Sequence, residues 1–569
     1  MINKIIWLLK ELDYLSKFLL LTVVIVFMSF LEALGIAIIF PMVTTLLDEN
    51  FYNSLSANIY ETLYSFGIVS NQDFLIMILA LIGCLYALKT LISMLAINFQ
   101  FSIIYAFQRE VALKVLSNIL DIQDVEVTNE ESAAKLTNTI HTEVALLSSV
   151  IANYINIIVD ILMSSFVLIT VIVIGSFYSI GMFAAIGLTA YLILKLSSSR
   201  LEYFGKIRQK FEANRLKVIG EGILGMREIK LFGFFRWFES NFNKINVAAL
   251  NARKKEAVIK SYPRHLLEFA IIVALVLFIF IWLMFSGLGT SSLIPVITLF
   301  AAASFKILPA ANRITTSIQA INFYGASVNT IFDLVRKTYS DVKSNQPINL
   351  IENINSIELE EMSFKYSSSK NILEKINFKL EKNQKIAVIG KSGSGKSTFI
   401  NLLCGLLQKT NGKYLINGNE VDYSIYQKAL FNACAYVSQK PFLFNSSLAE
   451  NISCFEENIN MGKIKEILEI VKLGELTESP EEFLISENQN NLSGGQIQRI
   501  GFARALYSDA QIFVLDEPTS SLDKENTKII NEIIYGLNAT IIWISHEEAS
   551  VQNCDKIFRI ENGNMKEVL

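Results

Sequence analysis

Long stretches of the chain are apolar and contain no basic residue. Lys and Arg are absent from 18–88, from 136–194 and from 265–305. Because a membrane-spanning helix needs about 20 apolar residues, each stretch has room for two spans and the loop between them. The apolar runs predict six spanning helices, at 18–47, 73–105, 140–175, 179–199, 264–286 and 291–330. Several are longer than a bilayer requires, so we expect them to extend well beyond it.

The basic residues between these stretches predict the orientation. The segment 195–264 alone contains 16 Lys and Arg residues. Positive charge is retained on the cytoplasmic side of a membrane, which places the N-terminus, 106–139, 200–263 and the C-terminal half in the cytosol. The alternative is a soluble helical domain with buried helices, and three separate cation-free stretches argue against it. In the first outer loop, apolar positions at near-helical spacing in 51–66 indicate either an amphipathic helix on the outer membrane face or an ordinary folded loop.

Composition agrees with a membrane protein. Of the 569 residues, 52% are hydrophobic and 18% are charged, whereas soluble proteins contain about 25% charged residues. The formal net charge of −3 excludes a general basic field for nucleic acid. The five cysteines match no metal motif or disulfide framework.

The pattern changes after about residue 338. A polar segment is followed by alternating strands and helices that are typical of an α/β domain. We therefore predict a transmembrane domain over 1–335, a linker over 336–351 and an α/β domain over 352–569.

A phosphate-binding loop lies early in the α/β domain. A strand ending in KIAVI runs into a GxxxxGKS sequence, and an apolar helical run follows it. Glycines allow backbone N–H groups to surround phosphates, and the helix N-terminus adds positive potential. The Lys is expected to reach the β- and γ-phosphates and the first Ser after it to bind Mg²⁺. The loop residues are Gly390, Ser392, Gly393, Ser394, Gly395, Lys396, Ser397 and Thr398.

Two adjacent acids end a second apolar strand, 512–515. Asp516 fits a carboxylate that holds Mg²⁺, and Glu517 fits a general base that activates water. Two acids at a turn also occur by chance, but a phosphate loop in the same domain favours the catalytic interpretation.

The sequence Leu492-Ser493-Gly494-Gly495-Gln496 resembles the signature motif of ABC transporter ATPases. The resemblance implies ATP and Mg²⁺ as cofactors and assigns further residues. Tyr366 resembles the aromatic residue that stacks on adenine, Gln439 the glutamine that contacts Mg²⁺, and His546 the histidine that contacts the γ-phosphate. The segment 520–523 resembles the loop that faces the dimer interface.

Two segments depart from the family pattern. Exporters often have Gly-Glu-x-Gly before the signature motif, whereas this chain has Ser486-Glu487-Asn488-Gln489. Ser521 stands where Ala is usual. These changes concern communication between subunits rather than ATP hydrolysis.

A six-span domain followed by one ATPase domain resembles a half-transporter of the type IV exporter fold. This resemblance implies a homodimer in which ATP lies between the phosphate loop of one copy and Ser493 of the other. The segments 121–133 and 219–231 resemble the coupling helices at the cytosolic turns. The alternative for both segments is a solvated helical hairpin.

Four basic residues lie in or beside the predicted spans: Lys89, Arg264, Lys306 and Arg313. Lys89 and Lys306 fall in the inner half of the bilayer, and both arginines fall near its inner boundary. Cations at such depths are costly and tend to face cavities or anionic partners. The alternative is that each side chain snorkels to the inner headgroups.

Three stretches, 27–46, 261–269 and 307–317, resemble PglK-type flippases of lipid-linked oligosaccharides. In that family, basic residues matching Lys89, Arg264 and Arg313 line the cavity and meet a pyrophosphate, and an external helix engages the polyprenyl tail. Glu32 lies in one of these stretches, and the sequence suggests no role for it.

We therefore expect an ATP-driven flippase that moves an anionic lipid-linked oligosaccharide to the outer leaflet of a bacterial inner membrane. Its expected partners are a second copy of the chain and membrane lipid, and not nucleic acid. The alternative is an exporter of a peptide, a bacteriocin or a hydrophobic drug, although no cysteine-peptidase domain precedes the first span. A soluble ABC ATPase acting on nucleic acid or ribosomes is excluded by the apolar half.

Overall fold

The structure is a computed structural model. It describes residues 1–47, 52, 57–120, 135–174, 179–285, 290–337, 353–365, 371–476, 478–486, 491–519, 522–546 and 551–568. These residues form two compact units, one ending at residue 337 and one beginning at residue 353. The predicted linker 336–351 falls almost wholly outside the described residues, and its bounds stay a prediction. Each unit is described by itself.

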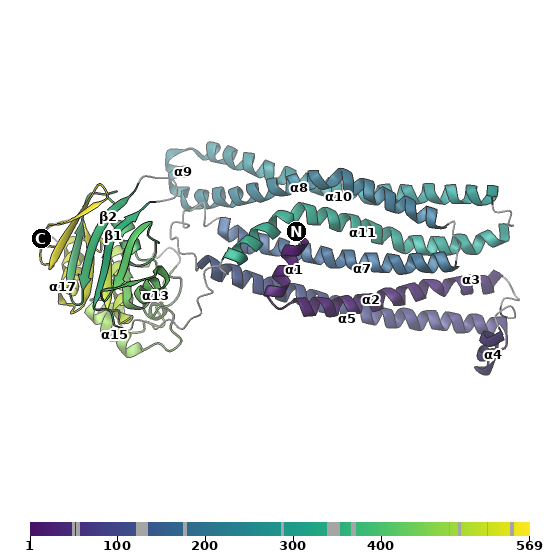
Figure 1. Cartoon of the computed structure of the whole chain (residues 1–569), viewed down its shortest axis with the longest axis horizontal. Helices are drawn as coiled ribbons and strands as arrows, with labels where there is room; N and C mark the ends of the chain where they lie inside the picture. Colours follow the sequence, from purple (N-terminus) through teal and green to yellow (C-terminus); the bar gives the residue numbers. More distant parts are fainter. Residues whose placement is uncertain are drawn as a thin grey trace. The chain divides into compact units, whose positions relative to one another are not determined.

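The N-terminal unit is helical (Figure 1). Its helices are α1 (Ile2–Glu11), α2 (Leu15–Ala37), α3 (Ile39–Leu47), α4 (Ala57–Ser65), α5 (Asn71–Leu120), the π-helical turn η3 (Thr139–Glu143), α7 (Val144–Ile174), α8 (Ser179–Leu224), α9 (Met226–Phe232), α10 (Phe235–Phe285) and α11 (Thr290–Lys337).

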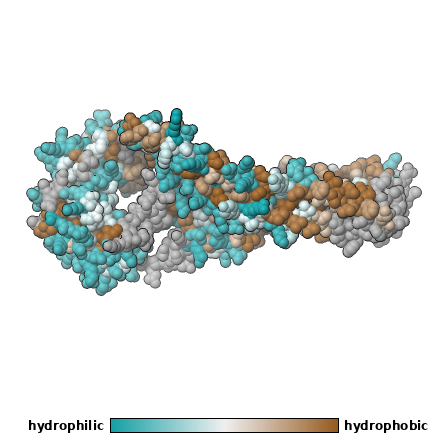
Figure 2. Space-filling view, turned by 90° about the horizontal axis from the view of Figure 1, so that it is seen from above, coloured by the Kyte–Doolittle hydropathy of each residue, from teal (hydrophilic) through white to brown (hydrophobic). Residues whose placement is uncertain are grey.

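The long helices coincide with the predicted spans and extend beyond them. Helices α5, α8, α10 and α11 contain 46 to 51 residues. At about 1.5 Å per residue they are roughly 70–75 Å long, more than twice the hydrocarbon thickness of a bilayer. Figure 2 shows hydrophobic side chains gathered toward one end of this bundle. Within the described residues, Leu15–Gly35, Asn71–Leu120 and Lys135–Val173 are long and apolar enough to cross a membrane. The count of six spans stays a prediction.

The prediction of one helix over 18–47 is wrong. The chain turns at Ile38, which separates α2 from α3. Pro41 explains the break, because a proline ring clashes with the carbonyl group four residues earlier. That carbonyl belongs to Ala37, the last residue of α2.

Two shorter predicted helices can be compared with the structure. The segment 51–66 contains α4, so the helix is confirmed, whereas its position on the membrane face stays a prediction. The segment 219–231 contains the end of α8, a turn at Gly225 and most of α9. The other predicted coupling segment, 121–133, lies outside the described residues.

The C-terminal unit contains two β-sheets. The strands are β1 (Ser356–Phe364), β2 (Leu373–Glu381), β3 (Lys385–Ile389), β4 (Asn411–Ile416), β5 (Asn419–Val421), β6 (Cys434–Val437), β7 (Ile512–Asp516), β8 (Thr540–Ser545), β9 (Lys556–Glu561) and β10 (Asn564–Glu567). An antiparallel sheet has the order β2-β1-β4-β5, and a six-stranded sheet has the order β10-β9-β3-β8-β7-β6. Strands β9, β3, β8, β7 and β6 are parallel, so their carboxyl ends meet at one edge.

Helices cover and connect these sheets. They are α12 (Lys396–Leu403), α13 (Tyr423–Ala433), α14 (Leu448–Ile452), α15 (Met461–Ile470), the 3₁₀ turn η4 (Gly474–Leu476), α16 (Gly494–Tyr507) and α17 (Lys524–Gly536).

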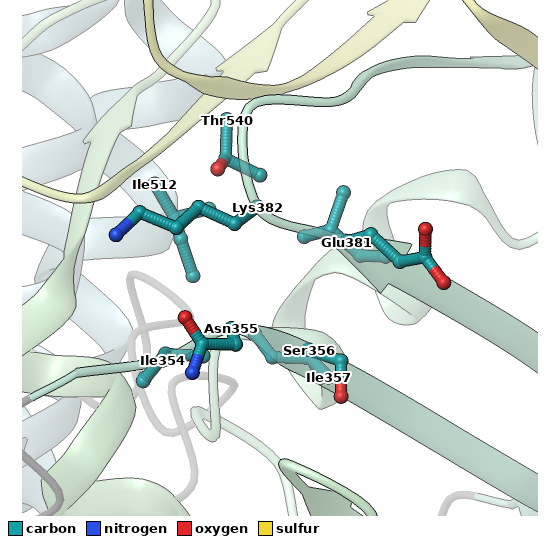
Figure 3. Close-up of a pocket in the computed structure, with 9 residues that line it drawn as sticks. Ile354, Asn355, Ser356, Ile357, Glu381, Lys382, Ile512 and Thr540 are labelled. Carbon is teal, nitrogen blue, oxygen red and sulfur yellow. The ribbon is translucent and has the colours of Figure 1, made fainter.

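Figure 3 shows a hollow where β1 and β2 approach β7 and β8, lined by residues including Ile354, Lys382 and Thr540. Its volume of about 10 Å³ is far below the roughly 300–1,000 Å³ of ligand pockets, so we assign it no ligand.

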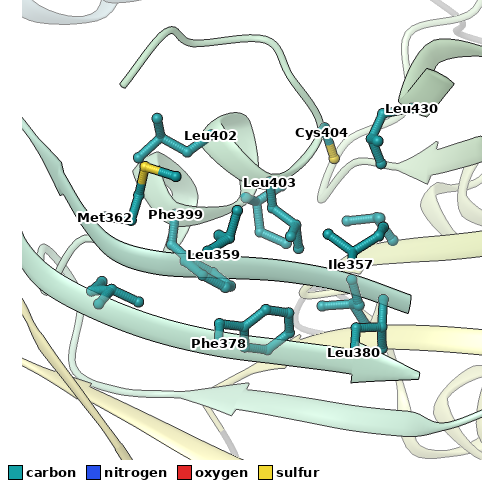
Figure 4. Close-up of a cluster of buried hydrophobic side chains, with 14 of the residues drawn as sticks. Ile357, Leu359, Met362, Phe378, Leu380, Phe399, Leu402, Leu403, Cys404 and Leu430 are labelled. Atoms are coloured by element: carbon teal, nitrogen blue, oxygen red, sulfur yellow. The ribbon is translucent and has the colours of Figure 1, made fainter. Parts of the chain in front are cut away.

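The core under the phosphate loop joins α12 to the antiparallel sheet (Figure 4). Phe399 of α12 packs edge-on against Phe378 of β2, with ring centroids 5.1 Å apart. Leu402 and Leu403 are also buried in this cluster, together with Leu359 of β1. Apolar packing against the antiparallel sheet therefore holds the first turn of α12 in place.

Helices α7 and α11 form the centre of the helical unit. Both contribute to the cluster with α1, α2 and α5 and to the cluster with α8 and α10. Helix α8 lies close against α11 at Gly205, where an added Cβ would lie 2.0 Å from the carbonyl oxygen of Phe323. Only glycine allows this approach, which brings the next turn of α8 against α11.

A buried polar network lies beside this contact. Arg208 of α8 pairs with Glu143 of η3, with Nη2 3.3 Å from Oε2, and both side chains are at most 2% exposed. The Ser327 hydroxyl of α11 donates to the same carboxylate. Gln209 donates to Thr330 Oγ1 at 2.9 Å. Three helical elements are thus joined by one carboxylate.

Removal of either charge should destabilise the bundle strongly. A buried ion left without its partner costs about 3–5 kcal/mol, whereas replacement of the whole pair by apolar residues is far less costly. Glu143→Gln should therefore lower the thermal unfolding temperature more than the double variant Glu143→Met/Arg208→Met does. Differential scanning fluorimetry of the purified protein measures both. Equal unfolding temperatures for Glu143→Gln and wild type would contradict this role.

Candidate functional site

The phosphate loop connects β3 to α12, as predicted. Gly390, Ser392, Gly393 and Ser394 lie in the loop, and Gly395 caps α12 with φ of 106°, a left-handed conformation that favours glycine. Ser397 and Thr398 lie in the first turn of α12, which begins at Lys396. The loop therefore ends at a helix N-terminus, where unpaired N–H groups attract phosphate.

Lys396 and Ser394 fit a phosphate ligand. The Lys396 ammonium donates to the carbonyl oxygens of Gly390 at 2.8 Å and Lys391 at 3.1 Å. Lys396 is buried, and burial lowers its pKa by more than the nearby Glu517 and Asp516 carboxylates raise it. The Ser394 hydroxyl is buried and has no hydrogen-bond partner among the described residues. An anion with several acceptor oxygens satisfies both groups.

Asp516 ends β7 at the carboxyl edge of the parallel sheet. The Tyr436 hydroxyl, from β6, donates to Asp516 Oδ2 at 3.0 Å. Burial raises the pKa of Asp516, and the Tyr436 hydrogen bond and the Lys396 charge oppose this effect only in part. The sequence analysis did not single out Tyr436, although it lies only three residues before Gln439.

Glu517 is held from two sides. Gln439 Nε2 donates to Glu517 Oε2 at 2.9 Å, and His546 Nε2 contacts Glu517 Oε1. His546 Nδ1 lies 3.1 Å from the Gly390 carbonyl oxygen and 3.4 Å from Lys396 Nζ. Glu517 has φ of 47°, a strained backbone angle for a residue with a side chain. The structure thus brings the phosphate loop and three predicted catalytic residues together.

The side chains present fit a magnesium–nucleotide complex. The predicted metal ligands are the Ser397 hydroxyl, the Gln439 amide and the Asp516 carboxylate, which are oxygen donors of the type Mg²⁺ prefers. No group of three or more His, Cys, Asp and Glu side chains that could hold a metal occurs in the part of the chain that the structure describes. Mg²⁺ usually takes much of its coordination from phosphate and water.

The residues of the signature motif form the N-terminus of another helix, α16. Ser493 caps α16, its hydroxyl accepting from the Gln496 N–H at 3.2 Å while Gln496 Oε1 accepts from the Ser493 N–H at 2.8 Å. Gln496 also donates to Glu475 at 2.8 Å. Gly494 and Gly495 form the first turn of α16. The N–H groups of this turn make a second anion-binding helix end.

Other predicted residues lie outside the described part of the chain. These are Tyr366, residues 520 and 521, and residues 487–489 of the altered segment before the signature motif. Asp523 is described, and it caps α17 by accepting from the Asn526 N–H at 2.8 Å.

The four basic residues that were predicted to lie in or beside the spans do not form one cluster. Lys89 of α5 and Lys306 of α11 both pair with Glu32 of α2. Arg313 of α11 pairs with another acid, and Arg264 of α10 pairs with Glu268 on its own helix at 3.0 Å.

The partner of Arg313 is Asp160 of α7, which the sequence analysis missed. Arg313 Nε lies 3.0 Å from Asp160 Oδ2, and Nη2 lies 2.5 Å from Oδ1. The Asp160 side chain is 2% exposed, whereas the Arg313 side chain is 51% exposed. The available signal was a lone carboxylate in a long cation-free apolar run, which is rare without a functional or pairing reason.

Comparisons with known proteins support the class that the fold and site define. Residues 373–520 match the ABC transporter family model. The fold resembles that of a bacterial Atm1-family ABC exporter solved with ATP bound, with a TM-score of 0.75 and 16% identity over 94% of both chains. The protein therefore has a helical N-terminal domain of exporter fold followed by an ABC ATPase domain.

Relatives of similar sequence include membrane transporters. The chain is 28% identical to the ATP-dependent lipid A-core flippase of Alkalilimnicola ehrlichii and 30% identical to that of Saccharophagus degradans, over 64% of this chain in each case. It is 26% identical to a probable ABC transporter ATP-binding/permease protein of Haemophilus influenzae, over 79% of this chain and 82% of the relative. The match spans 63% of the length of each of the two flippases.

The buried position of Asp516 predicts a pH-dependent stability. Because the folded state raises the pKa of this carboxyl, the nucleotide-free protein loses stability as pH rises through the folded pKa. Asp516→Asn removes that loss. The variant should therefore unfold at a higher temperature than wild type at pH 7, and the difference should shrink as pH is lowered toward 4. Thermal unfolding without nucleotide measures this, and a difference that grows on acidification would contradict the argument.

Proposed function

We propose that this protein is an ATP-driven flippase that moves an anionic lipid-linked oligosaccharide from the inner to the outer leaflet of a bacterial inner membrane. The observation that carries the proposal is the set of cations within the apolar helices of an exporter fold. The relatives named as lipid A-core flippases support a glycolipid substrate. The ATPase site supplies the energy.

In this proposal each ATPase residue has one task. The phosphate-loop N–H groups and Lys396 hold the β- and γ-phosphates, while Ser397, Gln439 and Asp516 would provide oxygen ligands for Mg²⁺. Glu517 accepts a proton from the attacking water. His546 contacts the γ-phosphate, and Tyr366 stacks on adenine.

Hydrolysis requires two copies of the chain. The Ser493 hydroxyl and the N–H groups at the N-terminus of α16 are suited to a phosphate. A homodimer offers Ser493 of the partner subunit to the nucleotide held by the first copy. Both copies then contain a full set of catalytic residues.

In the membrane, the basic side chains select an anionic headgroup. Arg313 is held by Asp160 through Nε and Nη2, yet half of its side chain is exposed. A guanidinium has five N–H donors, so it can bind this carboxylate and a phosphate oxygen together. Lys89 and Lys306 add two further ammonium groups, and Arg264 adds a fourth cation near the inner boundary.

The first prediction from this proposal separates ATP binding from ATP hydrolysis. Glu517→Gln should leave ATP binding intact and reduce hydrolysis at least about 100-fold, because the base is lost while the phosphate contacts remain. Lys396→Ala should weaken ATP binding itself. Glu420→Gln, in an exposed pair with Lys413 on the antiparallel sheet, is the control. Binding of a fluorescent ATP analogue and phosphate release measure the two steps. Hydrolysis by Glu517→Gln at the wild-type rate would refute the assignment.

The second prediction tests the substrate class. Arg313→Ala removes a charge-assisted contact worth about 1.5–3 kcal/mol and should reduce transport roughly tenfold or more. Arg313→Lys should rescue only part of the loss, because an ammonium lacks the planar donor pair. The measurement is translocation of a fluorescent lipid-linked oligosaccharide in proteoliposomes, normalised to protein. Lys206→Ala, in an exposed pair on α8, is the control.

Two outcomes would contradict the proposal. Full transport by Arg313→Ala at equal protein load would remove the role of the cation. Wild-type protein that moves a peptide or an uncharged drug but not the glycolipid would favour the alternative exporter. Transport of lipid A-core in place of a polyprenyl-linked glycan would retain the anionic glycolipid class and change the carrier.

A further inference from the structure

Ion pairs of Glu32 connect three helices in the membrane domain. It lies on α2, and its side chain is 7% exposed. One oxygen pairs with Lys89 on α5, and the other lies 2.8 Å from the Lys306 ammonium on α11. A single buried carboxylate therefore serves two cations from different helices.

The charges of Glu32, Asp160, Lys89, Lys306 and Arg313 do not balance. Arg313 and Asp160 form a neutral pair, but Lys89 and Lys306 share the one negative charge of Glu32. The three cations and two carboxylates leave one positive charge in surplus. In a medium of low polarity such a charge is costly, and an added anion stabilises it.

The three basic side chains are also more exposed than the two carboxylates. The side chains of Lys89, Lys306 and Arg313 are 20%, 31% and 51% exposed, whereas those of Glu32 and Asp160 are 7% and 2% exposed. An entering anion therefore meets the basic groups, with the carboxylates behind them. Each ammonium has three N–H donors, so it can donate to Glu32 and still have donors for an anion.

We propose that Glu32 is the internal counter-charge that sets how tightly Lys89 and Lys306 hold an anionic headgroup. Its negative charge limits the surplus to one, so that the headgroup is bound and can still be released. Glu32 acts through the lysines and does not touch the ligand. This inference rests on the proposed anionic substrate and assigns the residue that tunes its affinity.

The alternative is that Glu32 only ties helices together. The two roles differ in what a neutral isostere does. Glu32→Gln keeps the size of the side chain and raises the surplus charge from one to two. A counter-charge predicts tighter anion binding by this variant, whereas a structural tie predicts weaker binding or lower stability.

The experiment uses full-length protein in nanodiscs and two probes with the same tail, farnesyl diphosphate and uncharged farnesol. Glu32→Gln should bind farnesyl diphosphate about tenfold more tightly than wild type, since one repelling charge near the ligand is removed. Farnesol binding should not change. Equilibrium dialysis with radiolabelled probes gives both dissociation constants.

Two further variants isolate the charge. Glu32→Gln/Lys306→Met restores a surplus of one, so its affinity for farnesyl diphosphate should return to within about threefold of wild type. Glu202→Gln, in an exposed pair with Lys206 on α8, should bind as wild type does. Glu32→Asp keeps the charge and should also retain wild-type affinity, which covers the case in which Glu32→Gln does not fold.

The outcomes distinguish this inference from the proposed function. Wild type that binds farnesyl diphosphate and farnesol equally would contradict both. Wild type that prefers the diphosphate, together with a stable Glu32→Gln variant that binds it no more tightly, would overturn the role of Glu32 alone. Weaker binding by Glu32→Asp would also overturn it, because the charge is then unchanged.

Discussion

Three buried carboxylates inside the helix bundle, Glu32, Glu143 and Asp160, are held by basic residues on other helices, and this constraint governs the arrangement of the membrane domain. An isolated ion in an apolar medium is costly, so each one requires a partner that only the folded bundle can supply. Glu143 joins η3, α8 and α11, Glu32 joins α2, α5 and α11, and Asp160 joins α7 to α11. Helix α11 takes part in all three. A displacement of α11 would therefore alter all three ion pairs together.

The ATPase domain uses the same principle at the edge of a sheet. Glu517 contacts Gln439 and His546, and His546 in turn lies beside the Gly390 carbonyl and Lys396. The residues come from four separate segments of the chain and meet because parallel strands end at one edge. A nucleotide bound at the loop would compete for Lys396 and His546, which links occupancy of the phosphate site to the freedom of Glu517.

Much of this could be predicted from sequence, for reasons that are local. The absence of Lys and Arg from long runs located the helices, because an apolar membrane interior disfavours basic residues over a whole segment. The phosphate loop and Asp516 follow from short motifs that occur between predictable strands and helices. Gln439 and His546 were assigned by resemblance to a family, and the structure places both beside Glu517.

The ion pairs could not be predicted, because they depend on which helix faces are adjacent. Arg313 and Asp160 are 153 residues apart, and no spacing rule connects them. Tyr436 was overlooked because its contact with Asp516 depends on β6 lying beside β7. The break at Ile38 is different, since Pro41 was visible in the sequence and a helix drawn through it ignored the effect of proline on the preceding turn.

The most direct test of the account is whether transport by the wild-type protein requires a negative charge on the lipid. Two fluorescent glycolipids with the same glycan and polyprenyl tail are compared in proteoliposomes with MgATP, one joined by a diphosphate and the other by an uncharged ether. The account predicts ATP-dependent translocation of the diphosphate-linked lipid and little or none of the ether-linked lipid. Equal ATP-dependent translocation of both lipids would contradict it.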